Sequence, residues 1–329
     1  MTKKLLDVKN LRTCFYQDDK VIAAVDGVSF FVNKNSVVGL VGESGCGKTM
    51  TALSITHLLP KLNCKITGGV IKFKDQNLLG LDKEQLRSMR GKEISYIFQE
   101  PSTCLNPVLT LEEQMQEVVS LHRQDISRED RREFIIKQLK DVGINMPGDK
   151  IDAYPHQLSG GEKQRVMIAM AMIPQPKLLI ADEPTTALDV TIQAQILRLL
   201  QNLKNKYGMS ILLISHDLNV VGQVADYIAV MYAGQIVEFS SVDSLIKHPN
   251  HPYTKGLLNC LLDQDISSGS KLNVIEGEVP RADSYPCGCR FHPRCPSVFD
   301  RCKKEMPPIF CLDHSPQEVR CWLYSNSKT

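Results

Sequence analysis

Residues 42–49 read Gly-Glu-Ser-Gly-Cys-Gly-Lys-Thr, a glycine-rich loop whose residue types can bind phosphate. An apolar run, 37–41, precedes the loop, and a helix-compatible segment, 50–55, follows it. The glycines let the backbone point its N–H groups at phosphate oxygens, and the helix start adds positive potential. Lys48 is expected to reach the β- and γ-phosphates, and the Thr49 hydroxyl to ligate Mg²⁺. The alternative is a turn that binds nothing, but the complete pattern predicts a nucleoside triphosphate site.

A pair of carboxylates follows a second apolar run. Residues 178–181 are Leu-Leu-Ile-Ala, typical of a buried parallel strand, and Asp182 and Glu183 come directly after them. Ligands of α/β sheets bind at this end of the strands. Asp182 suits Mg²⁺ because hard cations prefer oxygen ligands, and Glu183 suits a general base for the attacking water. A helix cap would use the same residue types, but the nearby phosphate loop favours catalysis.

Two further strand ends carry polar side chains. Gln99 follows the expected strand 95–98, and His216 comes soon after the apolar run 211–214. Each alone is unremarkable, and a lone histidine at a strand end is more often structural. The same topology predicts that His216 lies near the γ-phosphate.

A second anion site is predicted at residues 158–165, which read Leu-Ser-Gly-Gly-Glu-Lys-Gln-Arg and open a helix over 166–172. Ser159 can cap this helix, and the two glycines expose its first amides. A simple helix cap is the alternative. One nucleotide rarely needs two phosphate cradles from one chain, so the second cradle indicates pairing across an interface.

The surrounding segments predict the elements that position these groups. Short apolar runs within 4–41 indicate strands of an antiparallel sheet ahead of the loop. Helical spacing within 110–156 indicates a helical subdomain inserted into an otherwise α/β chain. Phe15 or Tyr16 could stack on adenine, although both could simply pack a strand.

Composition limits the class of protein. The chain has 329 residues, 43% of them hydrophobic, and a net charge of +2. This charge gives no electrostatic sign of nucleic-acid binding. No apolar run approaches the roughly 20 residues that span a bilayer, and the polar start is not a secretory signal. We therefore expect a cytosolic chain that reaches a membrane only through a partner.

The cysteines are unevenly distributed. Of 11 in the chain, six follow residue 286, and in a reducing cytosol such clustering favours a metal site over disulfides. The six are Cys287, Cys289, Cys295, Cys302, Cys311 and Cys321.

The motifs occur in an order and at a spacing that resemble the ATPase subunits of ABC transporters. The matching motifs are Walker A (42–49), the Q-loop (Gln99), the signature (158–165), Walker B (Asp182-Glu183), the D-loop (Ala187-Leu188-Asp189) and the H-switch (His216). The resemblance covers residues 1 to about 240. It implies two such domains that sandwich two ATP molecules. Cys46 departs from the serine that is common in the family, and Glu100 from the more common aspartate.

The resemblance also assigns roles. Lys48 and Mg²⁺ would neutralise phosphate charge, Glu183 would position the water, and His216 would hold the γ-phosphate. Gln99 would link the site to the transmembrane subunits, and Thr49, Gln99 and Asp182 would hold Mg²⁺. The implied nucleotide contacts within the chain are Phe15, Gly42, Glu43, Ser44, Gly45, Cys46, Gly47, Lys48, Thr49 and Met50. Those made in trans are Ser159, Gly160, Gly161 and Glu162.

The end of the chain resembles oligopeptide and dipeptide importer ATPases. The shared features are His251-Pro252-Tyr253-Thr254, Glu278-Val279-Pro280 and the last cysteines. In that group such cysteines are associated with an iron–sulfur cluster. The matching positions, Cys289, Cys295, Cys302 and Cys321, could hold a [4Fe–4S] cluster. Their spacing fits neither a ferredoxin nor a two-residue zinc knuckle, so Zn²⁺ and unligated thiols remain alternatives. Cys287 and Cys311 are extra and could replace a ligand.

The predicted architecture is therefore α/β. An ABC-type P-loop ATPase domain over 1–240 has a mixed sheet core, an antiparallel β subdomain and an inserted helical subdomain at about 105–175. A small Cys-rich C-terminal domain over 241–329 follows it.

The resemblance implies an ATPase that powers peptide import. Its implied partners are a homologous second ATPase subunit or a second copy, two transmembrane permease subunits and an extracellular or periplasmic peptide-binding protein. Nucleic acid is not among them. The implied location is the cytoplasmic face of the cell membrane, reached through the permease. The alternatives are the same role for nickel or another small solute, and a soluble ABC ATPase associated with nucleic acid.

Overall fold

The computed structural model describes residues 3–17, 20–60, 62–186, 188–262, 275–312 and 317–325. The chain forms two compact units. Unit 1 contains Met1–Gly80 and Leu213–Thr329, and unit 2 contains Leu81–Leu212. Unit 2 is thus inserted into unit 1 in the sequence. The predicted boundary at residue 240 stays a prediction.

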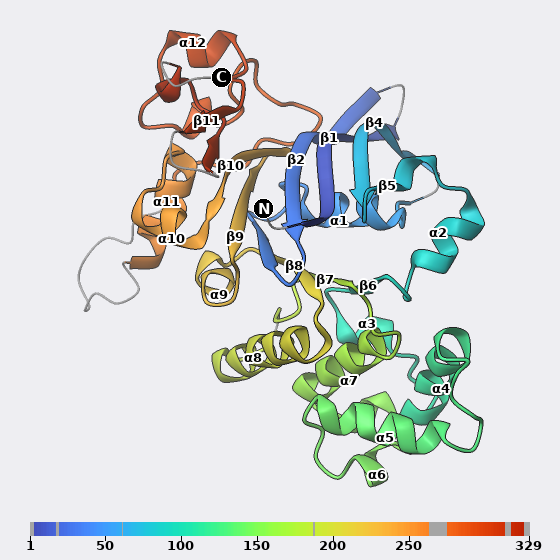
Figure 1. Cartoon of the computed structure of the whole chain (residues 1–329). Helices are drawn as coiled ribbons and strands as arrows, with labels where there is room; N and C mark the ends of the chain where they lie inside the picture. Colours follow the sequence, from blue (N-terminus) through green and yellow to red (C-terminus); the bar gives the residue numbers. More distant parts are fainter. Residues whose placement is uncertain are drawn as a thin grey trace. The chain divides into compact units, whose positions relative to one another are not determined.

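Unit 1 begins with an antiparallel sheet of strand order β2-β1-β4-β5 (Figure 1). Its strands are β1 (Lys4–Gln17), β2 (Lys20–Asn33), β4 (Cys64–Phe73) and β5 (Gln76–Asn77). The separate apolar runs of the sequence are joined into the two long strands β1 and β2. The β1–β2 pairing has bulges or irregularities at polar residues between these runs. Asn10, with φ 48°, lies at one such irregularity.

A second set of strands in unit 1 runs in the order β11-β12-β10-β9-β3. These strands are β3 (Val37–Val41), β9 (Tyr227–Tyr232), β10 (Gln235–Ser241), β11 (Phe310–Leu312) and β12 (Gln317–Val319). β3 pairs with β9 in parallel, whereas the other pairs are antiparallel, so the sheet is mixed. All five residues of β3 are buried. Gly39 lets Val221 pack directly against the backbone of β3, because a Cβ on Gly39 would lie 2.0 Å from Val221 Cγ1.

The described part of unit 1 also contains five helices (Figure 1). They are α1 (Lys48–Thr56), α9 (Leu218–Gly222), α10 (Val242–Lys247), α11 (Pro252–Leu262) and α12 (Asp300–Lys304), with 3₁₀ turns at Leu78–Gly80, His292–Arg294 and Trp322–Tyr324. β8 (Ser210–Ser215) leads the chain from unit 2 into unit 1.

Unit 2 is mainly helical and contains the parallel pair β6 (Ile94–Ile97) and β7 (Leu178–Asp182). Its helices are α2 (Lys83–Met89), α3 (Pro101–Cys104), α4 (Leu111–His122), α5 (Arg131–Asp141), α6 (Pro147–Lys150), α7 (Gly160–Met172) and α8 (Val190–Tyr207), with a 3₁₀ turn at Pro155–Gln157. The predicted cap of α7 is confirmed: Ser159 occupies its N-cap and the signature glycines form its first turn, so the helix begins six residues before the stretch 166–172.

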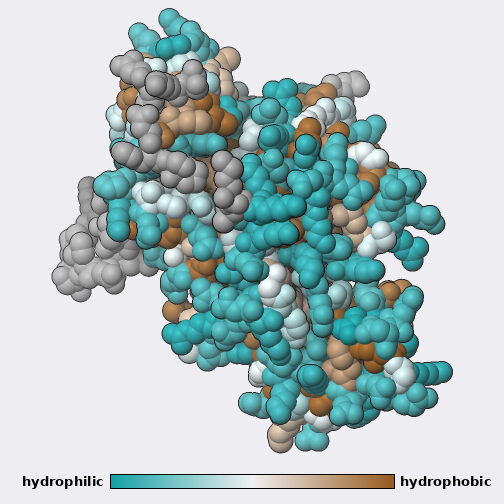
Figure 2. Space-filling model, in the orientation of Figure 1, coloured by the Kyte–Doolittle hydropathy of each residue, from teal (hydrophilic) through white to brown (hydrophobic). Residues whose placement is uncertain are grey.

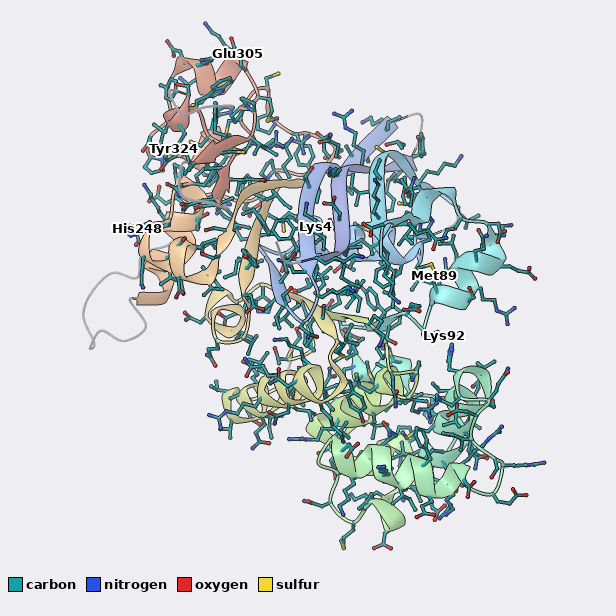
Figure 3. The ribbon with its side chains drawn as sticks, in the orientation of Figure 1. Lys4, Met89, Lys92, His248, Glu305 and Tyr324 are labelled. Atoms are coloured by element: carbon teal, nitrogen blue, oxygen red, sulfur yellow. The ribbon has the colours of Figure 1, made fainter. Side chains whose placement is uncertain are left out.

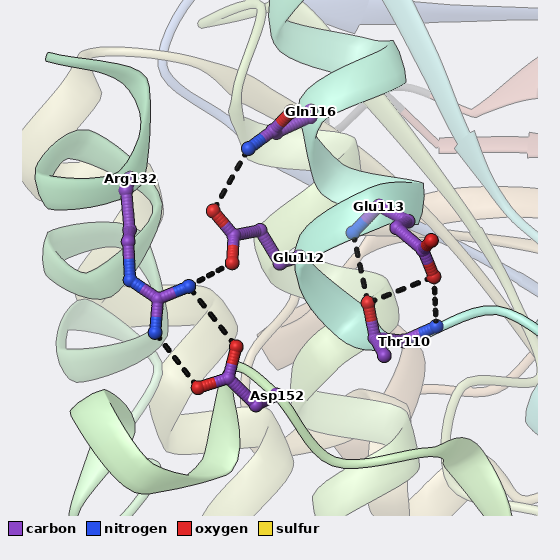
Figure 4. Close-up of polar contacts among 6 residues, drawn as sticks. All are labelled: Thr110, Glu112, Glu113, Gln116, Arg132 and Asp152. Atoms are coloured by element: carbon purple, nitrogen blue, oxygen red, sulfur yellow. Dashed lines mark hydrogen bonds and ion pairs between the residues drawn. The ribbon is translucent and has the colours of Figure 1, made fainter. Parts of the chain in front are cut away.

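Side-chain contacts cap the start of α4 and connect α4 to α5 (Figure 4). Thr110 and Glu113 form a capping box at the start of α4. Arg132 of α5 pairs with Glu112 of α4 and with Asp152 in the loop after α6. These contacts tie the helices of the inserted segment to one another.

The last residues form a small core of their own. Cys302, Phe310, Val319, Cys321 and Trp322 are buried together, and Cys289, Leu312 and Tyr324 pack against them. This core is joined to the sheet through the β10–β12 pair. Tyr324 donates a hydrogen bond to the Asn250 carbonyl, and Gln317 donates one to the carbonyl of His248, so the end of the chain is held beside α10 (Figure 3).

Within the described residues, no helix is both long and apolar enough to span a bilayer. The face in Figure 2 is dominated by hydrophilic side chains, with hydrophobic ones scattered among them.

Candidate nucleotide site

The glycine-rich loop lies between β3 and α1. Gly45 and Gly47 have φ of 77° and 105°, a region that side chains with a Cβ rarely adopt. A Cβ on Gly47 would also lie 2.5 Å from the carbonyl oxygen of Ala24. Gly47 is the N-cap of α1 and has no side chain to cap it, and the start of a helix is the kind of backbone that binds anions.

Lys48 is folded back over this loop. Its Nζ donates hydrogen bonds to the carbonyl oxygens of Gly42, at 2.7 Å, and of Glu43, at 3.1 Å. Cys46 is fully buried, with Sγ 4.0 Å from the same Nζ, and burial raises the pKa of its thiol to about 11. The loop is therefore preorganised around the Lys48 ammonium.

The two carboxylates predicted at the end of β7 are held by separate neighbours. Tyr96 Oη in β6 donates a hydrogen bond to Asp182 Oδ2 at 2.7 Å. Glu183 Oε2 accepts hydrogen bonds from Gln99 Nε2, at 3.0 Å, and from Thr186 Oγ1, at 2.9 Å. Glu183 also has φ 45°, a strained conformation that tends to occur at functional sites. Unit 2 thus brings three predicted residues, Gln99, Asp182 and Glu183, to the ends of two neighbouring strands.

The signature residues form the N-terminus of α7. The Ser159 hydroxyl accepts a hydrogen bond from the Glu162 N–H at 3.3 Å, and Glu162 Oε2 accepts one from the Ser159 N–H at 2.9 Å. The Ser159 N–H, with Lys150 nearby, lowers the pKa of Glu162. Gly160 and Gly161 make up the first turn, so this helix start has backbone amides of the kind that bind anions.

The remaining predicted residues lie at the surface or in strands. Phe15 is half-buried in β1, and Tyr16 is exposed, with Lys65 Nζ 5.8 Å from the centre of its ring. His216 is exposed and lies between β8 and α9. In the predicted D-loop, Ala187 lies outside the described residues, and Asp189 caps α8.

Four contacts of the site were missed by sequence reasoning: those of Tyr96, Thr186, Tyr253 and Arg294. Tyr96 could have been found, because it lies three residues before Gln99 in a strand that runs parallel to β7. Tyr253 accepts a hydrogen bond from the Glu43 N–H at 3.0 Å, and Arg294 pairs with the Glu43 carboxylate at 3.0 Å. These two residues are more than 200 positions from Glu43, and no local pattern indicates such contacts.

The four predicted cysteine ligands line one small pocket in the core at the end of the chain. Burial raises the pKa of Cys289 to about 11 and that of Cys321 to about 12, and neighbouring thiols add to both shifts. Among the described residues, no three His, Cys, Asp or Glu side chains are grouped so that they could hold one metal ion.

Comparison with known protein families gives two matches. Residues 25–186 match the model of the ABC transporter family. Residues 237–302 match that of the oligopeptide/dipeptide transporter C-terminal region.

Individual proteins are similar over nearly the whole chain. The oligopeptide transport ATP-binding protein AppD of Bacillus subtilis (strain 168) is 49% identical over 323 residues, which cover 97% of each chain. The dipeptide transport ATP-binding protein DppD of the same organism is 46% identical over 321 residues, covering 98% of this chain and 95% of DppD.

A solved structure confirms the fold. A dimeric post-hydrolysis state of the ATP-binding cassette MJ0796, bound to ADP and Pi, superposes with a TM-score of 0.64 at 28% identity. The match covers 72% of this chain and 98% of the cassette. The predicted ABC ATPase fold with a mixed sheet and helices is thus confirmed, whereas the Cys-rich C-terminal domain stays a prediction. The chain belongs to the family of ATP-binding subunits of oligopeptide and dipeptide ABC transporters.

Proposed function

We propose that this chain hydrolyses ATP to power the import of oligopeptides or dipeptides through a membrane ABC transporter. The observation that carries the proposal is the similarity to AppD, which extends over 97% of each chain. The match to the oligopeptide/dipeptide transporter C-terminal region favours peptides over nickel or another small solute.

In the proposed mechanism, the phosphates are bound at the start of α1, where the helix end is positive, and by Lys48, which exchanges the carbonyls of its own loop for phosphate oxygens. Thr49, Gln99 and Asp182 would supply oxygen ligands to the Mg²⁺ that accompanies ATP. Tyr96 supports this role, because its hydrogen bond orients the Asp182 carboxylate.

Glu183 is the proposed general base. Hydrogen bonds from Gln99 and Thr186 fix its carboxylate, and a base must be fixed in this way to align a water. His216 contacts the γ-phosphate in this proposal, and Phe15 or Tyr16 stacks on the adenine. Through its hydrogen bond to Glu183, Gln99 would connect the nucleotide site to the permease subunits.

A second ATPase subunit, either homologous or identical, completes each site with its own copies of Ser159, Gly160, Gly161 and Glu162. Closure of the pair provides the contacts that shift two permease subunits between inward- and outward-facing states. The chain would work at the cytoplasmic face of the membrane, and a peptide-binding protein would deliver the solute.

The test is transport by the complete complex in proteoliposomes, with labelled oligopeptide or nickel as alternative solutes. We expect ATP-dependent peptide uptake and peptide-stimulated phosphate release, both lost with Glu183→Gln. ATP-dependent nickel uptake without peptide uptake would refute the peptide assignment and keep the ATPase role. Salt-sensitive binding to nucleic acid without co-purification of permease subunits would refute both.

We further propose that Cys289, Cys295, Cys302 and Cys321 hold a [4Fe–4S] cluster. All four line one pocket, and four thiolates are the donor set that such a cluster requires. Zn²⁺ would need four ligand atoms about 2.3 Å from one ion. No three such side chains among the described residues are grouped to hold one metal ion, so the proposal rests on the shared pocket and on the resemblance of the cysteine positions. When bound, the cluster would offset the cost of burying four thiolates.

The cluster is tested by the iron, sulfide and zinc content of protein purified without oxygen, with its visible absorption spectrum. We expect roughly four irons and four sulfides per chain. This content should be lost with Cys295→Ser and retained with Cys311→Ser, since Cys311 is exposed and outside the pocket. Stoichiometric zinc, or no metal, would refute the cluster and leave the ATPase assignment intact.

A further inference from the structure

Every polar group of Glu43, the second residue of the phosphate-binding loop, has a partner within unit 1. Its N–H donates to the Tyr253 hydroxyl at 3.0 Å. Its carbonyl accepts from Lys48 Nζ at 3.1 Å, and its carboxylate accepts from Arg294 Nη1 at 3.0 and 3.2 Å. Two of these partners, Tyr253 and Arg294, come from the C-terminal part of the chain, so that part directly contacts the loop.

Burial and hydrogen bonds hold the Arg294 side chain in one conformation. Its side chain is only 5% exposed. Nε donates to the carbonyl of Glu276 at 2.9 Å, and Nη2 donates to that of Ile275 at 3.0 Å. The fork of a guanidinium can make these bonds and the Glu43 pair together, which an ammonium cannot do. The Arg294 guanidinium is therefore a fixed positive charge beside the Glu43 carboxylate of the loop.

The charge of Glu43 makes such a cation necessary. A carboxylate in a loop that binds polyphosphate repels its own ligand, and the repulsion is strong where solvent is partly excluded. The Glu43 side chain is only 32% exposed, so water screens it incompletely. Arg294 neutralises this charge and holds the carboxylate on the C-terminal side of the loop.

We infer that Arg294 is a positioning residue for the nucleotide site: it neutralises Glu43 and thereby sets the nucleotide affinity of the phosphate-binding loop. The inference rests on the proposed nucleotide site and adds a residue outside the motifs of that site. Nucleotide binding would then depend on the folding of the C-terminal segment, because the carbonyls of Ile275 and Glu276, which hold Arg294, belong to that segment.

The test is the Kd for Mg·ADP, measured by calorimetry on the full chain, with the KM and kcat of ATP hydrolysis. Arg294→Met should raise Kd and KM about tenfold, within the usual range of coupling between sites, and should change kcat far less. Glu43→Gln alone should lower Kd, because it removes the carboxylate that repels phosphate. The double variant should return to within about threefold of Glu43→Gln, because the charge that needed neutralising is gone.

The chain offers two controls. Arg301→Met removes an arginine of the same region that contacts Glu305 and Trp322, away from the loop, and should leave Kd unchanged. Trp322 is the single tryptophan and is buried in the C-terminal core, so its fluorescence reports whether that core is intact. It should be unchanged in Arg294→Met.

Unchanged affinity in Arg294→Met would overturn the inference. A loss that Glu43→Gln does not rescue, accompanied by altered Trp322 fluorescence, would also overturn it by showing only a packing role. If the unmodified chain failed to bind Mg·ADP, the proposed function itself would fail.

Discussion

Gln99 and Glu183 are joined by a hydrogen bond of 3.0 Å between Nε2 and Oε2, although 84 positions separate them in the sequence. Thr186 donates to the same oxygen, and the Glu183 backbone lies in the left-handed region. The residue proposed to activate water is therefore held by the residue proposed to communicate with the permease. Displacement of Gln99 would release one of the bonds that orient the base.

Replacement of the proposed base should separate binding from turnover. Glu183→Gln retains the shape of the side chain but removes its basicity, so we expect Mg·ATP binding to persist and phosphate release to fall by at least about 10²-fold. Glu129→Gln is a matched control, since Glu129 is exposed on unit 2, and it should hydrolyse ATP normally. Undiminished phosphate release from Glu183→Gln would contradict the assigned role.

Removal of the Tyr96 hydroxyl should destabilise unit 2. Burial and the nearby Asp182 carboxylate raise the pKa of Tyr96, so the hydroxyl stays protonated and donates to Asp182 at working pH. Tyr96→Phe should lower the free energy of unfolding by about 1.5–3 kcal/mol, measured by urea denaturation, because a buried carboxylate loses a donor. Tyr207→Phe is the control: Tyr207 also donates to a carboxylate, Asp141, but Lys206 remains paired with that group. Equal losses in the two variants would argue against a special role for Tyr96.

Ser159 allows the interface to be tested separately from the helix cap. Ser159→Ala should cost roughly 1 kcal/mol of stability through the lost cap. It should still permit ATP-dependent dimers in a Glu183→Gln background. Ser159→Arg adds bulk at the exposed start of α7 and should abolish those dimers while Mg·ATP still binds the monomer. Light scattering coupled to size exclusion makes the measurement, and dimers of the arginine variant would rule out the sandwich model.

The Cys46 thiol should react slowly and with a distinctive pH dependence. A pKa of about 11 instead of 9.0 makes its thiolate fraction about a hundredfold smaller at pH 8. Mass-spectrometric mapping after maleimide treatment should show exposed Cys311 modified long before Cys46. The rate at Cys46 should keep rising through pH 10, because the thiolate still gains population there. A plateau below pH 9 would contradict the raised pKa.

The motifs could be predicted because each is local. A buried strand, a glycine loop and a helix start are contiguous around Lys48, and the strand before Asp182 is an unbroken apolar run. The predicted Ser159 cap of α7 is confirmed, but the extents of strands were harder to predict, because bulges near Asn10 fuse separate runs into long strands. The pair Glu43–Arg294 could not be predicted, since neither residue has a periodic or spaced partner that indicates the other.

That pair also has a consequence for how the protein is made. Because 251 positions separate Glu43 from Arg294, a ribosome that adds 5–20 residues per second completes the loop roughly 12–50 s before it supplies the arginine. During this interval the nascent chain carries a nucleotide loop with an unneutralised carboxylate, and unit 2 emerges in the meantime. Full affinity for nucleotide should therefore arise only at the end of synthesis, and a chain truncated before residue 294 should be released as a weak binder.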